Sequence, residues 1–251
     1  MVFIPIKDFN RRIWIRFHYV TVALLGVTIL VFFAQASESQ QGAALMLYRY
    51  GLLPVVLFGS GQLDASIALL PAWASLITSM FLHGGFMHIA GNMLFLWVFG
   101  DNVEDSMGHR RFVVFYLVCG VAAGLAHAMA NPASELPMVG ASGAISGILG
   151  AYFVLHPKVK VWVLMFAWLP LKLPTYVILG GWIALQVFNS LNPGDSSNVA
   201  WWAHIAGFAS GALLIRHFKY PHVSLWDTSE GGEMKVGGLR LRSRHKWGGE
   251  G

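Results

Sequence analysis

The sequence contains a single cysteine, Cys119, and this limits the kinds of site that the chain can build. No disulfide can form within the chain, and a cysteine-based metal site is excluded. Because Cys119 lies inside an apolar run, we expect it to fill space in a hydrophobic core.

Charged residues are also scarce. Only 12% of the 251 residues are charged, about half the usual fraction for a soluble domain, and 56% are hydrophobic. Several apolar runs are long enough to cross a hydrocarbon core of roughly 30 Å as helices. They lack the alternation of apolar and polar residues that a transmembrane barrel requires. The sequence therefore predicts an all-α polytopic membrane protein.

The apolar runs predict six transmembrane helices. Their expected ranges are 18–34, 77–99, 111–130, 142–155, 174–190 and 201–218. Basic residues gather before the first span and after the second, fourth and sixth, which predicts that both termini are cytoplasmic. This distribution accounts for the pI of 9.5 without a nucleic-acid partner. A bacterial cytoplasmic membrane is the simplest location.

The first span could instead be a signal peptide, because basic residues precede it. Five further spans come after it, so we interpret it as a retained helix.

The chain divides into three predicted parts. A basic cytoplasmic segment, 1–17, precedes a six-helix domain, 18–218, and a Gly-rich basic cytoplasmic tail, 219–251, follows it and is expected to be disordered. Within the domain, loop 35–76 is long but substantially apolar, so we expect it at the outer membrane interface. Residues 161–171 are apolar but too short to span, and we expect an interfacial segment there.

Carboxylates are missing from the interior of every predicted span, because all twelve Asp and Glu residues lie in loops, at span ends or in the tails. An aspartyl intramembrane protease needs two intramembrane aspartates, and a zinc protease of the H-E-x-x-H type needs that helical motif. Both are therefore excluded. A proton-coupled transporter usually has intramembrane carboxylates or broken helices at matching positions, and neither is evident.

A few other polar residues do lie within or near the spans. The candidates among them are His83, His88, Asn92, His127, Ser142, Ser146 and His204. Ionisable or polar groups at such positions are costly in hydrocarbon, so each is a candidate for function.

Ser142 lies in VGASGAISGILGAY (139–152), where small residues repeat every four positions. Ala203, Gly207 and Gly211 repeat in the same way beside His204. Such stripes let helices approach closely, and a close approach would bring Ser142 within hydrogen-bond reach of His204. Neutral imidazole can then take the proton of a serine nucleophile. Packing alone is the alternative interpretation, and it stays open here.

His88 and Asn92 are four residues apart, so they share one face of a helix. Together with backbone N–H groups at the start of the Ser142 helix, they could donate hydrogen bonds to an oxyanion. They could equally form structural hydrogen bonds between helices.

Three motifs together resemble the signature of the rhomboid intramembrane serine proteases. HGGFMHIAGN (83–92), GASG (140–143) and AHIAG (203–207) occur in the family's order, on the second, fourth and sixth predicted spans. EDSMGHRR (104–111) is similar to a further family element, Glu–x₃–Gly followed by a basic residue. The resemblance covers about residues 18–218.

The resemblance implies a role for four residues. Ser142 would be the nucleophile and His204 the general base of a Ser–His dyad. His88 and Asn92 would hold the oxyanion with the backbone N–H of Ser142. No cofactor or metal ion is implied.

The resemblance also bears on three neighbouring positions. His83 would support the outer loop. His127 matches no catalytic position, and we expect a structural histidine with satisfied hydrogen bonds. Ser146 stands where many members carry an aromatic residue that packs against the catalytic histidine.

The implied function is an intramembrane endopeptidase that cleaves transmembrane protein substrates within the lipid bilayer, near its outer face. An inactive rhomboid-like protein that binds membrane clients is the alternative, although such relatives usually lack the serine or the histidine.

Overall fold

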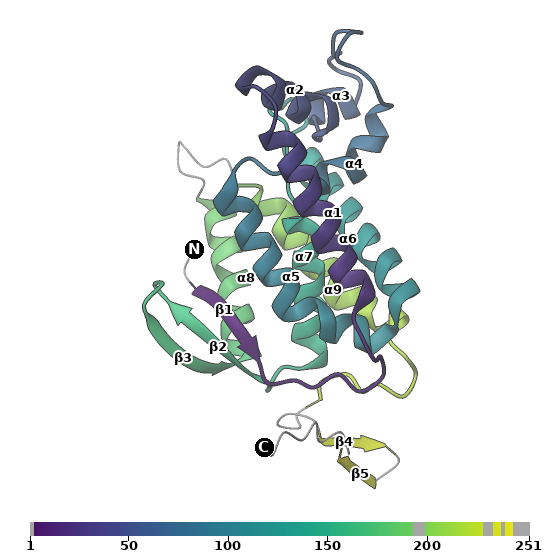
Figure 1. The fold of residues 1–251 in the computed structure, drawn as a ribbon, viewed down its shortest axis with the longest axis vertical. Helices are drawn as coiled ribbons and strands as arrows, with labels where there is room; N and C mark the ends of the chain where they lie inside the picture. Colours follow the sequence, from purple (N-terminus) through teal and green to yellow (C-terminus); the bar gives the residue numbers. More distant parts are fainter. Residues whose placement is uncertain (1–2, 193–198, 228–232, 237–238, 243–251) are drawn as a thin grey trace.

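Each predicted span contains a helix. The structure is a computed structural model that describes residues 3–192, 199–227, 233–236 and 239–242, the last two ranges by their backbone only. The helices are α1 (Tyr19–Ala36), α5 (Phe86–Met107), α6 (His109–Ala130), α7 (Ser142–Leu155), α8 (Thr175–Leu191) and α9 (Trp201–Phe218). Figure 1 shows α7 in the middle of this bundle, in contact with α5, α6, α8 and α9. The largely helical architecture is therefore confirmed.

Helix length and composition identify fewer than six membrane crossings among the described residues. By these criteria α1 and α6 can each cross a membrane, and α5 adds a third crossing if it is joined to the short helices before it. The apolar helices α7 and α8 are shorter. Six crossings therefore stay a prediction.

The second predicted span, 77–99, is not one continuous helix. The segment 72–81 forms the short helices η1 (Ala72–Ala74), α4 (Ser75–Thr78) and η2 (Ser79–Phe81), and it meets α5 at an angle of 82°. Gly84 and Gly85 lie at the break, and Gly85 has an extended backbone. Two successive glycines weaken a helix, so the chain turns there, and the prediction of a continuous helix is wrong.

Loop 35–76 forms α2 (Gln40–Tyr50) and α3 (Pro54–Leu57) at one end of the bundle (Figure 1). Leu52 and Met138 exchange two backbone hydrogen bonds, of 2.9 and 2.8 Å. The loop is thereby joined to the segment that leads into Ser142.

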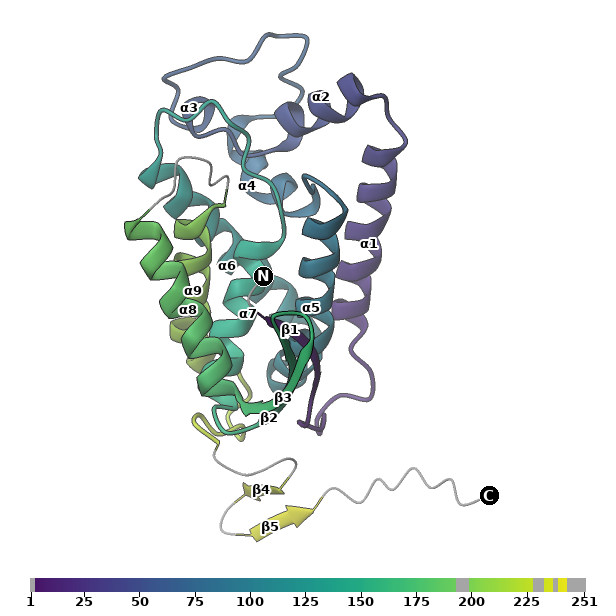
Figure 2. The same ribbon diagram turned by 90° about the vertical axis from the view of Figure 1, so that its left-hand side faces the viewer.

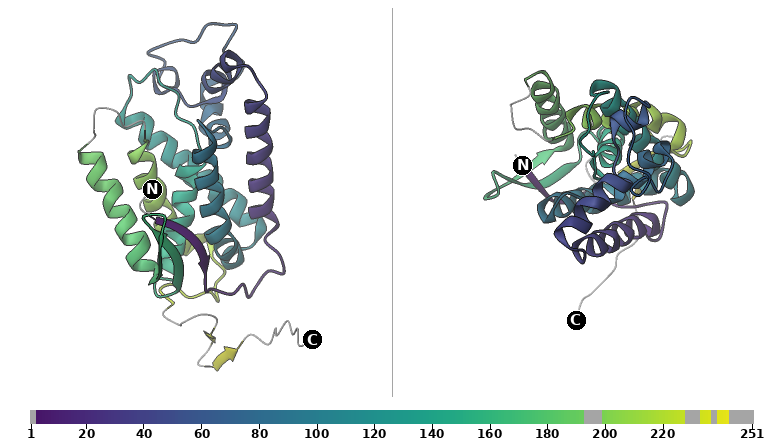
Figure 3. Two further views of the ribbon diagram at one scale, coloured as in Figure 1. Left: turned by 60° about the vertical axis from the view of Figure 1, so that its left-hand side comes forward. Right: turned by 90° about the horizontal axis from the view of Figure 1, so that it is seen from above.

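The expectation of an all-α protein is wrong at the opposite end of the bundle. There β1 (Phe3–Asp8), β2 (Lys160–Met165) and β3 (Leu169–Pro174) form an antiparallel sheet in that order. The sheet lies at the lower end of the helices in Figure 3, where β1 contacts α5 and β3 contacts α8.

Side-chain alternation in β2 explains why residues 161–171 form a hairpin. Val161 and Val163 are buried, whereas Lys160 before them and Trp162 between them are exposed. This period of two, with β-branched residues on the buried face, is typical of a half-buried strand. The location of this hairpin at a membrane interface stays a prediction.

The N-terminal segment is fastened to α5 by two carboxylates. Asp105 accepts hydrogen bonds of 2.7 Å from three successive backbone N–H groups, at residues 13–15. The fully buried Glu104 accepts from the backbone N–H (2.8 Å) and hydroxyl (2.6 Å) of Thr21 in the first turn of α1. A carboxylate at this place satisfies N–H groups that have no partner within the helix. Figure 2 shows α1 lying along α5.

The predicted disordered tail is ordered where it begins. Backbone N–H groups of Tyr220 and Trp226 donate to Ser106 and Val154, each at 2.8 Å, so the prediction is wrong for 219–227. Farther along, β4 (Glu233–Val236) and β5 (Leu239–Arg242) pair as a hairpin. The remainder of the predicted tail lies outside the described residues.

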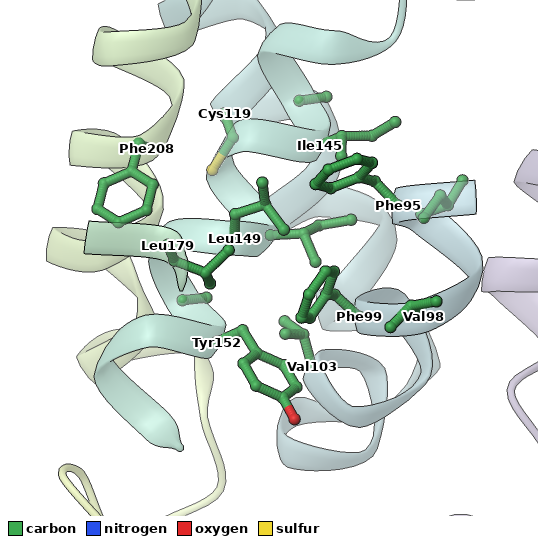
Figure 4. Packing of buried hydrophobic residues seen from close by; sticks show 14 of the residues in the cluster. Phe95, Val98, Phe99, Val103, Cys119, Ile145, Leu149, Tyr152, Leu179 and Phe208 are labelled. Carbon is green, nitrogen blue, oxygen red and sulfur yellow. The ribbon is translucent and has the colours of Figure 1, made fainter. Parts of the chain in front are cut away.

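The core surrounds α7, as Figure 4 shows for a part of it. Tyr152 on α7 packs edge-on against Phe99 of α5, with ring centroids 5.0 Å apart. Cys119 is buried in the same cluster, as expected from the sequence.

The closest helix contact joins α7 and α9. A Cβ at Gly207 would collide with the carbonyl oxygen of Gly143, and a Cβ at Gly211 with that of Gly147. Close approach through the small-residue stripes is therefore confirmed.

This contact predicts that Gly211→Ala destabilises the protein. The added methyl group has no room against the backbone of α7, and we expect the free energy of unfolding to fall by about 1–3 kcal/mol, the usual cost of overpacking. Gly181→Ala on α8 is the matched control, because a Cβ there meets nothing within 4 Å. Thermal unfolding in detergent measures both variants, and equal stability of the two would contradict the proposed contact.

Asp8 of β1 connects the sheet to two helices. Its Oδ2 accepts hydrogen bonds from the Tyr152 hydroxyl on α7 (2.6 Å) and from the Asn102 amide on α5 (2.7 Å). Burial raises the pKa of Asp8 from 3.8 to about 7. Repulsion from Asp101 adds to this effect, whereas the hydrogen bond from Tyr152 opposes it.

The raised pKa predicts a pH-dependent stability. The folded protein holds the Asp8 proton more tightly than the unfolded chain, so the associated stability is complete below about pH 4 and is lost as pH rises through about 7. The slope is at most about 1.4 kcal/mol per pH unit. Asp8→Asn, which mimics the neutral acid, should make the unfolding midpoint fall less steeply between pH 5 and 8 than in the wild type.

Asp64→Asn serves as the control for Asp8→Asn. Asp64 is fully exposed, and hydrogen bonds from Ser66 lower its pKa, so it stays ionised throughout this pH range. A wild-type midpoint that does not fall between pH 5 and 8 would refute the prediction.

Candidate active site

Ser142 and His204 lie within hydrogen-bond distance of each other. His204 Nε2 is 3.0 Å from Ser142 Oγ, although the two residues are 62 positions apart in the chain. Ser142 is the first residue of α7, and His204 lies in the first turn of α9. The geometric expectation from the sequence is thus confirmed, and it follows from the close contact of Gly207 with Gly143 one turn below.

His204 has a second hydrogen-bond partner, which the sequence analysis missed. Its Nδ1 is 2.8 Å from Oε1 of Gln186 on α8. An amide oxygen can only accept, so Nδ1 carries the proton of the neutral ring, and Nε2 offers its lone pair to the Ser142 hydroxyl. The available signal was an amide in the apolar span 174–190, which also contains Asn189.

Aromatic rings also surround the His204 imidazole. The ring centroid of Trp182 lies 5.9 Å away at a tilt of 37°, and that of Trp201 lies 6.3 Å away, edge-on. Ser146 makes no such contact, because its hydroxyl donates to the Ser142 carbonyl oxygen at 2.6 Å within the same helix.

His88 and Asn92 lie one turn apart on α5, as the spacing predicts, and both face the segment before Ser142. A Cβ built on Gly140 would meet the His88 ring at 2.7 Å and Asn92 Nδ2 at 3.8 Å. Gly140 has φ of +122°, a conformation that favours glycine. Glycine is therefore required at this position for both its backbone and its lack of a side chain.

His88 and Asn92 present two N–H donors to the segment at Gly140. The backbone N–H of Gly84 donates to His88 Nδ1 (3.4 Å), so the neutral ring carries its proton on Nε2. Nε2 and Cε1 are the His88 atoms nearest to a Cβ built on Gly140. Asn92 Nδ2 is buried and has no hydrogen-bond partner among the described residues. A structural bridge between helices would normally satisfy this donor.

The two remaining histidines near the site, His83 and His127, differ in their hydrogen bonding. His83 is buried beside His88, with ring centroids 5.0 Å apart, and its Nε2 accepts from the backbone N–H of Ala141 at 3.5 Å. His127 lies within electrostatic range of His204, as does His88. Buried His127 Nδ1 has no hydrogen-bond partner in the described part of the chain, so the expectation of a satisfied histidine is wrong.

The arrangement can support acyl transfer chemically. A hydroxyl lies against an unprotonated imidazole nitrogen, and unpaired donors lie near the start of α7, where backbone N–H groups also lack helical partners. Within the described residues, no group of three or more His, Cys, Asp or Glu is placed to hold a metal ion.

Residues 71–220, more than half of the chain, match the family model described as the Rhomboid domain. The chain is similar to RHOMBOID-like protein 5 of Arabidopsis thaliana, with 29% identity over 68% of this chain and 52% of that protein. It is 34% identical to the rhomboid protease GluP of Bacillus subtilis, over 52% of this chain and 23% of the relative.

A yeast relative, rhomboid protein 1, mitochondrial, of Saccharomyces cerevisiae, is 30% identical over 55% of this chain and 40% of its own length. The chain thus spans about half or less of the length of these relatives.

Proposed function

Because the chain belongs to the rhomboid family, we propose that it is an intramembrane serine endopeptidase that hydrolyses peptide bonds in or near transmembrane segments of other membrane proteins. The observation that carries the proposal is the 3.0 Å contact between Ser142 Oγ and His204 Nε2. The family includes inactive members as well as proteases, so the argument for activity depends on this chain's own residues.

In the proposed reaction, Ser142 attacks the carbonyl carbon of the scissile bond. His204 Nε2 takes the hydroxyl proton as the bond forms and then gives it to the departing amine. Water, activated by the same nitrogen, hydrolyses the acyl-enzyme and releases Ser142. Both proton transfers require the tautomer in which Nε2 is unprotonated at the start, and the Gln186 contact favours that tautomer.

His88, Asn92 and the backbone N–H of Ser142 hold the oxyanion in this mechanism. Support comes from the unpaired Nδ2 of Asn92 and from the Nε2 proton of His88, both on the side of Gly140. Donors that are placed before reaction stabilise the developing charge without the cost of reorganisation. His88 is exposed, which gives substrate and water access to this edge of the site.

We further propose that α1, α5, α6, α7, α8 and α9 all cross the bilayer within a domain at 18–218, with both termini cytoplasmic. The N-terminal segment and residues 219–227 both contact the end of α5 around residue 105, which supports a common side for them. Ser142 then lies toward the outer face, under loop 35–76, and substrates are cut there.

The relatives do not identify one particular membrane for this protein. They include proteins named as mitochondrial and as chloroplastic, and proteins of Bacillus subtilis. The bacterial cytoplasmic membrane stays our proposal, on the basis of the sequence alone.

The dyad predicts the effect of removing either member. Ser142→Ala and His204→Ala should each lower kcat by at least about 10³-fold in liposomes with a model transmembrane substrate, because the nucleophile or its base is lost. Ser190→Ala is the control, since that hydroxyl donates only to its own helix, at the Val187 carbonyl oxygen. Undiminished cleavage by either dyad variant would refute the assignment.

A fluorophosphonate probe separates the protease from an inactive family member. The wild type should be labelled at Ser142, and Ser142→Ala should not. No labelling together with no cleavage by the wild type would favour a client-binding protein.

The oxyanion assignment predicts a loss in kcat with little change in KM for Asn92→Ala. Removal of one donor of this kind typically costs about 10²–10³-fold in rate. Asn192→Ala is the matched control, because its amide donates only to the Phe188 carbonyl oxygen at the end of α8. An increase in KM alone would assign Asn92 to substrate binding instead.

A further inference from the structure

We propose that Gln186 is a positioning residue for His204, so that the reactive unit is a hydrogen-bonded relay of Ser142, His204 and Gln186. This inference rests on the proposed protease function and names a third member that the dyad description lacks. The contact that supports it is the 2.8 Å distance between Gln186 Oε1 and His204 Nδ1.

The orientation of Gln186 is determined by the packing of α8. Its side chain is 5% exposed, whereas the flanking Leu185 and Val187 are 37% and 41% exposed. Gln186 therefore points into the bundle while its neighbours point outward. A buried amide is costly unless its polar atoms are paired, and His204 supplies a partner for the amide oxygen.

The amide determines which nitrogen of His204 can act as a base. A neutral imidazole exchanges its proton between Nδ1 and Nε2, and only the Nδ1–H form leaves Nε2 able to accept from Ser142. Gln186 Oε1 stabilises the Nδ1–H form by accepting its hydrogen bond. Without this acceptor, the ring can hold its proton on Nε2 and present a second donor to the serine hydroxyl, which is unproductive.

A neutral amide suits this location better than a carboxylate. The usual third member of a serine-protease triad is an ionised acid, which also stabilises the imidazolium. An ionised carboxylate inside an apolar span carries a large desolvation cost, and glutamine keeps the acceptor without the charge.

Helix α8 also supplies ring packing for His204. Trp182 lies one turn before Gln186, on the same face, and its ring is 5.9 Å from that of His204. Beside Trp201 of α9, α8 therefore provides both ring packing and the hydrogen bond that orient the imidazole.

The test uses two variants in the full-length protein. Gln186→Met keeps the length but removes the acceptor, and we expect kcat to fall about 10- to 100-fold with KM within about two-fold. The loss is smaller than the ~10⁴ seen when the acid of a charged triad is replaced by its amide. Gln186→Glu keeps an acceptor on a side chain of the same size, and we expect kcat within about ten-fold of the wild type.

The pH profile separates positioning from packing. With Gln186→Glu, the acid limb of the kcat profile should move to higher pH, because a carboxylate stabilises the protonated imidazolium. The other titratable groups near His204 among the described residues are His88 on α5 and His127 on α6, and neither changes between variants. Ser190→Ala, on the same helix, should leave both kcat and the profile unchanged.

Two kinetic results would overturn the inference. The first is an unchanged kcat in Gln186→Met. The second is an equal loss in both variants with no movement of the acid limb, which would mean that position 186 only fills space.

The ¹⁵N shifts of the His204 ring keep the test independent of activity. They should report the Nδ1–H tautomer in the wild type and in Ser142→Ala, and a mixture or the Nε2–H form in Gln186→Met. The signal is assigned by its loss in His204→Ala. If the wild type does not cleave but shows this tautomer pattern, the protease proposal fails while the positioning of His204 by Gln186 stands. An Nε2–H ring in the wild type refutes the positioning.

Discussion

At Gly207 and Gly211, α9 has no room for a side chain between its own backbone and the carbonyl groups of α7. Because association of helices in lipid depends on packing, this lack of side chains lets the two backbones approach closely. The approach places the first turn of α9 against the first residue of α7, so that His204 reaches Ser142. A wider spacing of these two helices would separate the pair without any change in the residues themselves.

The polar groups of the bundle are arranged around this contact in two different ways. Toward the sheet, buried carboxylates are satisfied: Glu104 and Asp105 bind the backbone of the N-terminal segment and of α1. Around Ser142 the polar groups are left partly unpaired, as for Asn92 Nδ2 and His127 Nδ1. Unpaired buried polar atoms cost free energy, and within the described residues they also occur away from the serine–histidine pair, for example at His18 Nδ1 and Asn102 Oδ1.

Much of the fold and site could be predicted from local patterns. Apolar length predicts every major helix, and fourfold spacing places His88 beside Asn92 on one face of α5. The apolar content of residues 161–171 predicts an interfacial segment, whereas the alternation of Val161 and Val163 with outward residues indicates a strand. The break at Gly84 and Gly85 was missed because apolar residues continue on both sides of it.

Sequence alone determined the chemistry that is available: one candidate nucleophile among apolar neighbours, histidines in place of carboxylates, and small residues where two helices must meet. Only the tertiary structure decided which of these groups interact. Gln186 appears in the sequence as one of two amides in an apolar span, with nothing to mark a partner. Its distance from His204 depends on the rotation of α8 against α9, and that rotation is set by side-chain packing between helices rather than by any local pattern in the chain.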